Sequence, residues 1–521
     1  RIAHKVLADG DVLQIGTDVT LTYSVQSAAR VEPVSSQTLD LRNCNRLTFG
    51  RDSQNNTVIN HPAVSRFHAE IKKQGGSWVL TDLDSTNGTF VNGKQILGDR
   101  VLMVGDTIRI GSCSFVFNMD ETLVKRNEEG NLRLDALHLN KVVGKGVNLL
   151  QDISLSVLAR EFVVIAGVSG GGKSTLLDAL NGFRPATSGS VLVNNVDLYK
   201  NFNAYRTELG YVPQKDIVHT ELTVFEALNY AAKLRMPADT TKAERLTRVE
   251  EVLEDLQLTH RRDVPIKNLS GGQLKRVSMG VELLTKPSLF FLDEATSGLD
   301  PGTEADIMQL LRKLANQGRT VLLITHATKN VKLCDLVMFL AKGGYVAYFG
   351  PPNEAAAYFG VEDFDEVYSK VERELSPQEW QQRYLKSRQY QKYVVERQSA
   401  VVNQPQAASN APASGKQKAA SRQIKSSKKS VSALRQFVIL SERNLSILIR
   451  DRASLILMGA IAPILGVLDF VTWKRDLFDS QKGEASQAIT MLFTTALIAV
   501  MVGSLSTMRE IVKEQEIYRR E

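Results

Sequence analysis

Cysteine is scarce in this sequence. Its 521 residues include three cysteines, Cys44, Cys113 and Cys334, which lie far apart and are odd in number. This distribution excludes a disulfide framework and offers no CxxC pair for zinc, so the thiols indicate a reducing compartment. The chain opens at Arg1 with no charged-then-apolar signal segment, so secretion has no support and we expect an excerpt of a longer protein.

Excess charge is also missing from most of the chain. Acidic residues are absent from Ser399–Leu434, and this stretch carries six cations: Lys416, Lys418, Arg422, Lys425, Lys428 and Lys429. Subtracting six from the net charge of +7 leaves about +1 for the remainder, so a nucleic-acid-binding surface is not indicated. The stretch is rich in Ala, Ser, Gln and Lys and buries too little apolar surface to fold, so we predict a disordered linker. Its cations favour association with anionic membrane lipids; a solvated spacer is the alternative.

The N-terminal part predicts an all-β sandwich. Up to about Asn118, short alternating apolar stretches are separated by Gly, Asn and Asp. An internal repeat lies here, because Leu7–Gly16 aligns with Leu102–Gly111, and an alternating strand follows each copy. The chain is therefore expected to open with the end of one sandwich and to continue into a complete second one.

The middle of the chain predicts an α/β domain, and its end predicts membrane spans. From Leu132 to Val361, near-continuous apolar runs typical of buried parallel strands alternate with helical stretches, and a charged helical insert covers about Glu221–His260. Near the end, Ala453–Trp473 and Ala488–Met508 are apolar over about 20 residues, long enough to cross a bilayer. Buried core helices are the alternative, but two such stretches in succession favour membrane spans.

A phosphate-binding loop follows one of the apolar runs. Gly167–Ser174 has the pattern GxxxxGK[ST] between a predicted strand and a predicted helix. Its glycines let backbone N–H groups face phosphate oxygens, and the helix N-terminus adds a positive end. Lys173 is then expected to reach the β- and γ-phosphates of a nucleotide, and Ser174 to ligate Mg²⁺.

Further motifs follow in a fixed order. Leu289–Glu294 reads as a buried strand that ends in two carboxylates, of which Asp293 suits a water-mediated hold on Mg²⁺ and Glu294 suits activation of the attacking water. Leu269–Gln273 opens another helix whose N–H groups could receive a phosphate. The order is completed by Tyr211–Gln214, Ser297–Asp300 and His326.

This ordered set resembles the ATP-binding-cassette (ABC) family over residues 132–361. The resemblance implies two cassettes that sandwich two ATP molecules, with His326 at the γ-phosphate, and Gln214 sensing Mg²⁺ and reporting to the membrane part. The implied catalytic residues are Glu294, His326, Gln214 and Lys173, and the implied metal-binding residues are Ser174, Gln214 and Asp293. The implied nucleotide-binding residues are Gly167, Ser169, Gly170, Gly172, Lys173, Ser174 and Thr175 of one chain, with Ser270, Gly271, Gly272 and Gln273 facing them from the other. Asp300 is a further implied nucleotide-binding residue.

Two departures from the family pattern stand out. Leu132–Glu161 has no Phe, Tyr or Trp to stack on adenine, so base selectivity is expected to be loose. Ala295 stands where many members carry Pro, a change expected to be silent.

The flanks resemble the white/brown (G-type) half-transporters of this family. The resemblance implies a dimer, a homodimer in the first instance, that exports a lipid or other hydrophobic compound. The segments before the first predicted span and after the second carry several Lys and Arg, while the loop Lys474–Glu484 between the spans balances three basic against three acidic residues. This asymmetry is expected to place the cassette on the cytoplasmic side of the cell membrane. The alternatives are a non-transporting ABC ATPase and a membrane-anchored signalling scaffold with a vestigial cassette.

Residues 39–119 resemble the forkhead-associated (FHA) domain, a sandwich that binds phosphothreonine peptides. The resemblance rests on Phe49–Arg51, Ser65–His68, Ser85–Thr89 and Asn92–Gly93. It implies a phosphopeptide site made of Arg51, Ser65, Arg66, Thr86 and Asn87, and a Ser/Thr kinase as a further partner. Arg51 can fork onto a phosphate, and Ser65 and Arg66 add a hydroxyl and a second cation.

The source of the phosphothreonine stays open between two possibilities. One is a separate protein, such as the kinase itself, and the other is the chain's own linkers, through Thr38 or Thr122. The predicted fold class is a multidomain chain: an all-β FHA sandwich, an α/β P-loop cassette with a helical insert, and an all-α transmembrane segment. The predicted boundaries are 1–25 (end of a first sandwich), 26–38 (linker), 39–119 (FHA domain), 120–131 (linker), 132–361 (cassette), 362–398 (charged helical segment), 399–434 (basic linker) and 435–521 (start of the membrane domain).

Overall fold

The computed structural model describes residues 12–15, 19–22, 36–128, 130–326, 330–402, 433–473, 477–479 and 484–520. Most of the predicted basic linker lies outside these residues. At the N-terminus, β1 (Val12–Ile15) and β2 (Val19–Thr22) form an antiparallel hairpin, in the region where the end of a first sandwich is predicted.

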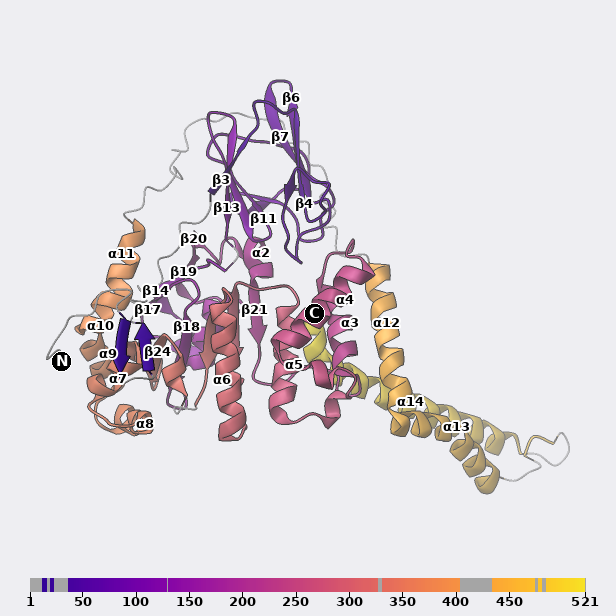
Figure 1. Cartoon of the computed structure of the whole chain (residues 1–521). Helices are drawn as coiled ribbons and strands as arrows, with labels where there is room; N and C mark the ends of the chain where they lie inside the picture. Colours follow the sequence, from indigo (N-terminus) through magenta and orange to yellow (C-terminus); the bar gives the residue numbers. More distant parts are fainter. Residues whose placement is uncertain are drawn as a thin grey trace.

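Two sheets form the FHA sandwich (Figure 1). The first has the order β10-β7-β6-β4-β5, with β4 (Arg46–Gly50), β5 (Thr57–Val58), β6 (Ala69–Gln74), β7 (Ser77–Asp82) and β10 (Arg100–Val101). The second has the order β3-β13-β12-β11-β8-β9, with β3 (Ser36–Asp40), β8 (Phe90–Val91), β9 (Lys94–Gln95), β11 (Thr107–Ile110), β12 (Cys113–Phe117) and β13 (Thr122–Asn127). Alternating apolar residues bury Phe49 and Phe115 between the sheets, with ring centroids 5.0 Å apart.

Strands β3 and β13 extend the sandwich beyond the predicted limits of 39 and 119. They pair with each other along their length, with Thr38 opposite Val124. Thr122 is buried, and its hydroxyl donates to Asp120 at 2.6 Å. Both threonines proposed as phosphorylation sites in linkers therefore lie within paired strands.

The cassette is built around a six-stranded sheet of order β21-β22-β23-β18-β24-β25. Its strands are β18 (Phe162–Gly167), β21 (Leu209–Val212), β22 (Leu289–Asp293), β23 (Thr320–Ile324), β24 (Leu336–Ala341) and β25 (Tyr345–Gly350), and only β25 runs antiparallel to its neighbour. β18, β22 and β23 are buried at every position, which explains their continuous apolar runs. The carboxyl ends of the parallel strands consequently meet at one edge.

An antiparallel sheet and several helices cover this core. The sheet has the order β17-β14-β19-β20, with β14 (Leu134–Asn140), β17 (Ile153–Val157), β19 (Ser188–Val193) and β20 (Val196–Asp197), and a hairpin pairs β15 (Val142–Val143) with β16 (Val147–Asn148). The cassette helices are α1 (Lys173–Leu180), α2 (Phe202–Tyr205), α3 (Val224–Arg235), α4 (Lys242–Asp255), α5 (Gly271–Leu283) and α6 (Pro301–Asn316). Helices α3 and α4 form the predicted helical insert, and each begins with a Thr–Glu capping box.

The predicted charged helical segment packs onto the cassette. After α7 (Pro352–Phe359) it comprises α8 (Phe364–Arg373), α9 (Pro377–Leu385), α10 (Arg388–Tyr390) and α11 (Glu396–Val402). Trp380 of α9 is fully buried against Phe359, with ring centroids 5.3 Å apart. Arg397 forms an ion pair with Glu161 at the start of the central strand β18.

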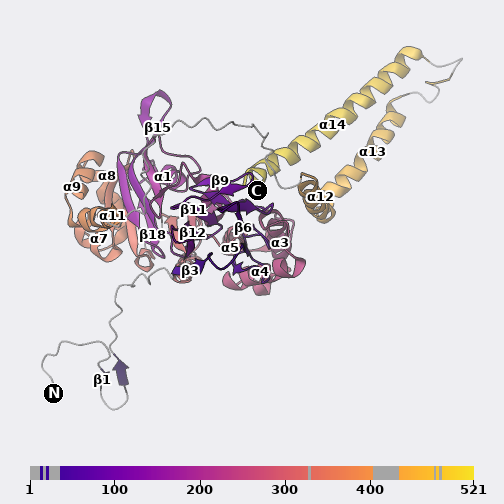
Figure 2. The same ribbon diagram turned by 90° about the horizontal axis from the view of Figure 1, so that it is seen from above.

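Three helices end the chain: α12 (Ala433–Arg450), α13 (Arg452–Thr472) and α14 (Ala485–Arg520). Helix α12 lies along α3, and α13 and α14 run side by side away from the cassette (Figures 1 and 2). Within the ranges that the structure describes, none of the helices combines the length and the apolar character needed to cross a membrane.

Candidate functional site

The phosphate loop lies between β18 and α1, as predicted. Positive φ angles at Gly170 and Gly172, of 74° and 82°, require glycine in this turn. Gly167 also tolerates no side chain, because an added Cβ would lie 2.3 Å from the carbonyl oxygen of Leu340. Ser169 and Gly170 are exposed at the tip of the loop, and Thr175 follows in the first turn of α1. The glycines thus fix the backbone conformation of the phosphate loop.

Lys173 and Ser174 turn into this loop from the start of α1. The Lys173 ammonium donates to the carbonyl oxygens of Gly167 and Val168, each at 3.0 Å. Burial lowers the pKa of Lys173, against the opposing effect of the nearby carboxylates of Glu294 and Asp293. Ser174 Oγ donates to Asp293 Oδ1 at 3.1 Å, so a hydroxyl and a carboxylate oxygen lie side by side.

The two carboxylates predicted at the end of β22 differ in their surroundings. Asp293 is buried, and its burial raises the pKa of the carboxyl group, as does the neighbouring charge of Glu294, against the hydrogen bond from Ser174. Glu294 is the first residue after the strand and has a φ of 50°, a left-handed conformation that non-glycine residues rarely adopt. Its N–H donates to the carbonyl oxygen of Ile324 on β23.

Two of the predicted catalytic residues, Gln214 and His326, contact a third, Glu294. Gln214, in the loop after β21, donates from Nε2 to Glu294 Oε2 at 2.7 Å. His326, after β23, has its Nε2 3.4 Å from Glu294 Oε1. A carboxylate held between an amide and an imidazole, above a buried aspartate, can orient a water molecule for attack and accept its proton.

Lys275 is a contributor that the sequence reasoning missed. From α5 it donates to the backbone carbonyl oxygen of Gln214 at 2.8 Å and lies 3.1 Å from Asp216. It thereby fixes the loop that carries Gln214. A single lysine inside a helix offers no sequence signal for this role.

The second predicted nucleotide-binding group lies elsewhere on the cassette. Ser270 caps α5, accepting from the N–H of Gln273, and Asp300 caps α6, accepting from Gly302 and Thr303 at 3.1 and 3.0 Å. A surface hollow of about 770 Å³ is lined by Ser270, Gly272, Gln273 and Arg276, together with Thr303, Asp306 and the segment 257–260. No residue of the phosphate loop is among those lining it, so one chain does not bring these two groups together.

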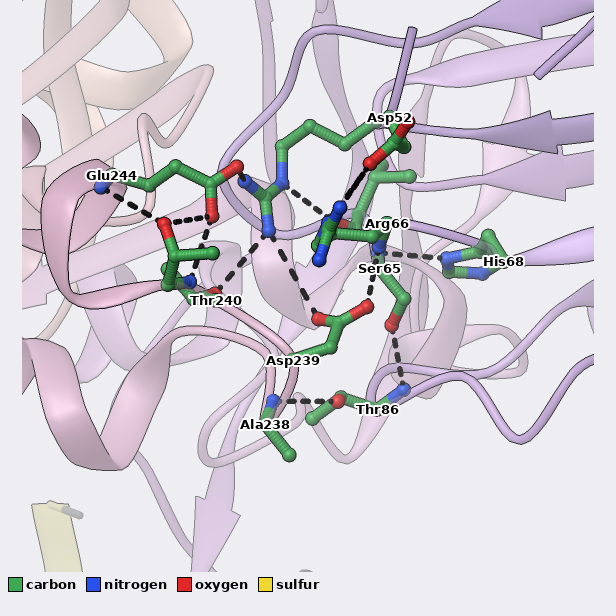
Figure 3. Close-up of polar contacts among 12 residues, drawn as sticks. Asp52, Ser65, Arg66, His68, Thr86, Ala238, Asp239, Thr240 and Glu244 are labelled. Atoms are coloured by element: carbon green, nitrogen blue, oxygen red, sulfur yellow. Dashed lines mark hydrogen bonds and ion pairs between the residues drawn. The ribbon is translucent and has the colours of Figure 1, made fainter. Parts of the chain in front are cut away.

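Three of the five predicted phosphopeptide residues contact the cassette (Figure 3). The Arg51 side chain pairs with Glu244, the Arg66 N–H donates to Asp239, and Thr86 Oγ1 accepts from the N–H of Ala238. Ser65 Oγ accepts from the N–H of Thr86 at 3.1 Å. The fifth residue, Asn87, donates instead to the carbonyl oxygen of Ala63 at 2.6 Å.

The loops that carry these residues are held by buried groups. His68 accepts at Nδ1 from the Ser65 N–H, and its Nε2 lies 3.2 Å from the Gly88 carbonyl oxygen. Full burial lowers the pKa of His68, which favours the neutral ring that these bonds require. The side chain of Arg66 pairs with Asp52, and this pairing raises the pKa of Arg66. The conformation of these loops is therefore fixed by contacts within the sandwich.

Comparisons with known proteins agree with both regions. Residues 150–297 match the family model described as ABC transporter, and residues 47–111 match the model of the FHA domain. Over 482 residues the chain is 34% identical to the ABC transporter ATP-binding/permease protein Rv1747 of Mycobacterium tuberculosis, a match that covers 91% of this chain and 52% of that protein.

The cassette alone is similar to G-family proteins. ABC transporter G family member 28 of Arabidopsis thaliana is 38% identical over 225 residues, covering 42% of this chain and 20% of the relative. The broad substrate specificity ATP-binding cassette transporter ABCG2 of Bos taurus is 39% identical over 209 residues, covering 38% of this chain and 31% of the relative. The chain spans about half the length, or less, of these curated relatives.

Proposed function

Because this chain belongs to the ABC transporter family through its ATP-binding cassette and joins that cassette to an FHA domain, we propose that it is the ATP-hydrolysing part of a G-type half-transporter. The cassette is an ABC-type ATPase domain. The proposed transporter works as a dimer in the cell membrane, exports a lipid or other hydrophobic compound, and is regulated when the FHA domain recognises phosphothreonine. The relatives' similarity and the order of cassette and apolar helices support this reading.

The observation that carries the proposal is the convergence on Glu294. Gln214 and His326 hold its two carboxylate oxygens, beside the pair formed by Ser174 and Asp293. The oxygen donors of that pair fit Mg²⁺, a hard cation that prefers oxygen ligands and, when bound, neutralises charge on the phosphates. Lys173 would leave its two carbonyl partners for the phosphates, while Glu294 orients the attacking water and takes its proton.

A physical route supports coupling of this site to the helices that follow. From Gln214 the chain continues to Leu222, which packs with Tyr230 of α3 and Ile439 of α12. The Tyr230 hydroxyl lies 2.9 Å from Ser446 Oγ, and Lys233 pairs with Glu442. A change at Gln214 can therefore be transmitted to α12, which we propose as the connecting helix.

Apolar side chains on the last two helices support the membrane assignment. Leu468, Phe470 and Val471 of α13, and Leu492 and Phe493 of α14, are each at least half exposed in this chain. Such surfaces need cover from lipid or from further helices. Thr495 of α14 donates to Asp469 of α13 at 3.0 Å, so the acid in the first apolar stretch has a partner.

Replacement of Glu294 with Gln tests the proposal in the assembled transporter. The amide keeps the shape of the side chain but cannot take a proton, so ATP should still bind while turnover falls by about 10²–10⁴. ATP binding and phosphate release are the two measurements, and Glu362→Gln, an exposed acid that is not one of the site residues, is the matched control. Wild-type turnover in Glu294→Gln would remove the role given to this residue.

A further inference from the structure

The phosphate-recognition face of the FHA domain is already engaged within this chain. Its central cation, Arg51, has a side chain only 9% exposed. The guanidinium pairs with Glu244 and lies 3.4 Å from Thr240 Oγ1 and 4.0 Å from Asp239 Oδ1. All three partners belong to the cassette, in the connection between α3 and α4 and the first turn of α4 (Figure 3).

The same segment also engages the neighbouring donors. Asp239 Oδ2 accepts from the backbone N–H of Arg66 at 2.5 Å. The N–H of Ala238 donates to Thr86 Oγ1 at 3.1 Å, a bond from backbone to side chain of the kind that holds a peptide. The segment Ala238–Glu244 therefore contacts three of the residues expected to receive a phosphothreonine peptide.

The chemistry of the segment suits a phosphate site. Two carboxylates, Asp239 and Glu244, present about two negative charges and four acceptor oxygens, similar to a phosphothreonine at neutral pH. Burial would raise the pKa of Glu244, but hydrogen bonds from Thr241 and the charges of Arg51 and Arg66 outweigh it and lower the pKa. The carboxylate of Glu244 thus remains charged opposite the arginine.

We propose that Ala238–Glu244 is an intramolecular acidic ligand of the FHA domain, which a phosphothreonine peptide must displace in order to bind Arg51. The proposal rests on the proposed function, since it names what regulates the phosphothreonine site. The competing ligand is a segment of the cassette, so the binding state of the FHA domain is linked to the position of the helical insert.

A second contact keeps the FHA domain on the cassette when the acidic segment is released. Arg109 of β11 donates to the carbonyl oxygen of Ala204 at 3.0 Å, and its guanidinium lies 3.9 Å over the ring of Tyr205. Arg109 also pairs with Glu128, and its side chain is 7% exposed. A domain held in this way meets the acidic segment at high effective concentration, so carboxylates that bind weakly alone can compete with a peptide.

Release has a consequence for the rest of the cassette. The acidic segment joins α4 to α3, and α3 holds α12 through Tyr230 and Lys233. With the FHA domain docked, the insert is fixed from both sides. When a phosphothreonine replaces the acidic segment at Arg51, the insert is held only by the cassette core and α12. The insert is then free to adjust during the ATP cycle.

The double variant Asp239→Asn/Glu244→Gln isolates the acidic segment. Gln at position 244 can still accept from Thr241 and complete the capping box of α4, so the helix is retained. The matched control is Glu254→Gln, an exposed acid farther along the same helix. Arg51→Ala removes the receptor cation.

The probe is a labelled pool of peptides with one fixed phosphothreonine and mixed flanking residues, titrated into the whole chain. We expect the double variant to bind the pool about tenfold more tightly than wild type. The acidic segment then no longer occupies the Arg51 site, so the peptide no longer competes with it. Glu254→Gln should bind as wild type does, and Arg51→Ala should not bind. In hydrogen exchange, the amides of Arg66 and Ala238 should lose protection in the double variant and on addition of the pool.

The outcomes separate the proposal from the function on which it rests. Equal affinity of wild type and the double variant, or unchanged exchange at Arg66 and Ala238, overturns the intramolecular ligand and leaves phosphothreonine recognition standing. Binding by the double variant alone is the strongest support. If no variant binds the pool, both the intramolecular ligand and the proposed phosphothreonine recognition are overturned, because the FHA domain then does not bind phosphothreonine.

Discussion

At the scale of single residues, the backbone at Glu294 is under strain. A φ of 50° in a residue with a Cβ costs about 1 kcal/mol relative to glycine. The conformation persists because the N–H of Glu294 donates to Ile324, and because its carboxylate is held by Gln214 and His326. Strain retained at the position proposed to activate water fits a residue placed for chemistry rather than for stability.

Two small substitutions at Glu294 separate these effects. Glu294→Gly and Glu294→Ala both delete the carboxylate and should both abolish hydrolysis. Only glycine relieves the backbone strain at this position. The free energy of unfolding of Glu294→Gly should therefore exceed that of Glu294→Ala by about 1 kcal/mol. Thermal or urea unfolding of the two variants measures the difference. Equal stabilities would show that the left-handed conformation carries no strain.

At the scale of elements, the contact between α3 and α12 can be tested by exchanging charges. Lys233 of α3 and Glu442 of α12 lie 2.7 Å apart. A second ion pair joins Glu226, near the start of α3, to Arg450, at the end of α12. Lys233→Glu places two acids together and should weaken the docking of α12 by about 0.5–1 kcal/mol. The exchange Lys233→Glu/Glu442→Lys should restore most of this loss.

Hydrogen exchange along Ala433–Arg450 provides the measurement. The single variant should lose protection over α12, and the exchanged pair should regain it. If the double variant is no better protected than Lys233→Glu alone, this ion pair does not hold the helix, and the contact rests on the other pairs, Tyr230 with Ser446 and Glu226 with Arg450.

The elements also show how far the sequence could predict the site. Gln214 and Glu294 are 80 positions apart, yet their meeting follows from parallel strands that end at one edge. Arg51 and Glu244 are 193 positions apart and belong to different domains, so no periodicity or motif joins them. Strand β13 reads as a charged linker in the sequence, because its residues become a strand only through pairing with β12 and β3.

At the scale of the whole molecule, the proposed function implies an ATP site that is shared between two chains. The phosphate loop and the hollow at Ser270 lie in different parts of the cassette, and we propose that the hollow of a second copy completes the site. This predicts that defects in the two halves complement each other. Lys173→Ala removes the phosphate ligand from one half, and Gly271→Asp places a carboxylate at the start of α5.

Gly271 is a suitable place for this change because the fold should survive it. It is exposed at the first position of α5, and an acid in the first turn of a helix is favourable for the helix itself. The same charge opposes a phosphate brought to that N-terminus by a partner. A loss of hydrolysis in Gly271→Asp would then report on the site between chains rather than on misfolding.

Mixing the two variants tests the composite site directly. Each variant alone should be inactive as an assembled dimer, since every site in it contains a defective half. In a mixed dimer, the intact loop of the Gly271→Asp chain meets the intact hollow of the Lys173→Ala chain, which restores one site of two. Random pairing makes half of the dimers mixed, so co-assembled protein should recover about one quarter of wild-type hydrolysis. Phosphate release from separately prepared and co-assembled transporters measures this recovery. No recovery in demonstrably mixed dimers would mean that the two halves do not meet across a pair of chains.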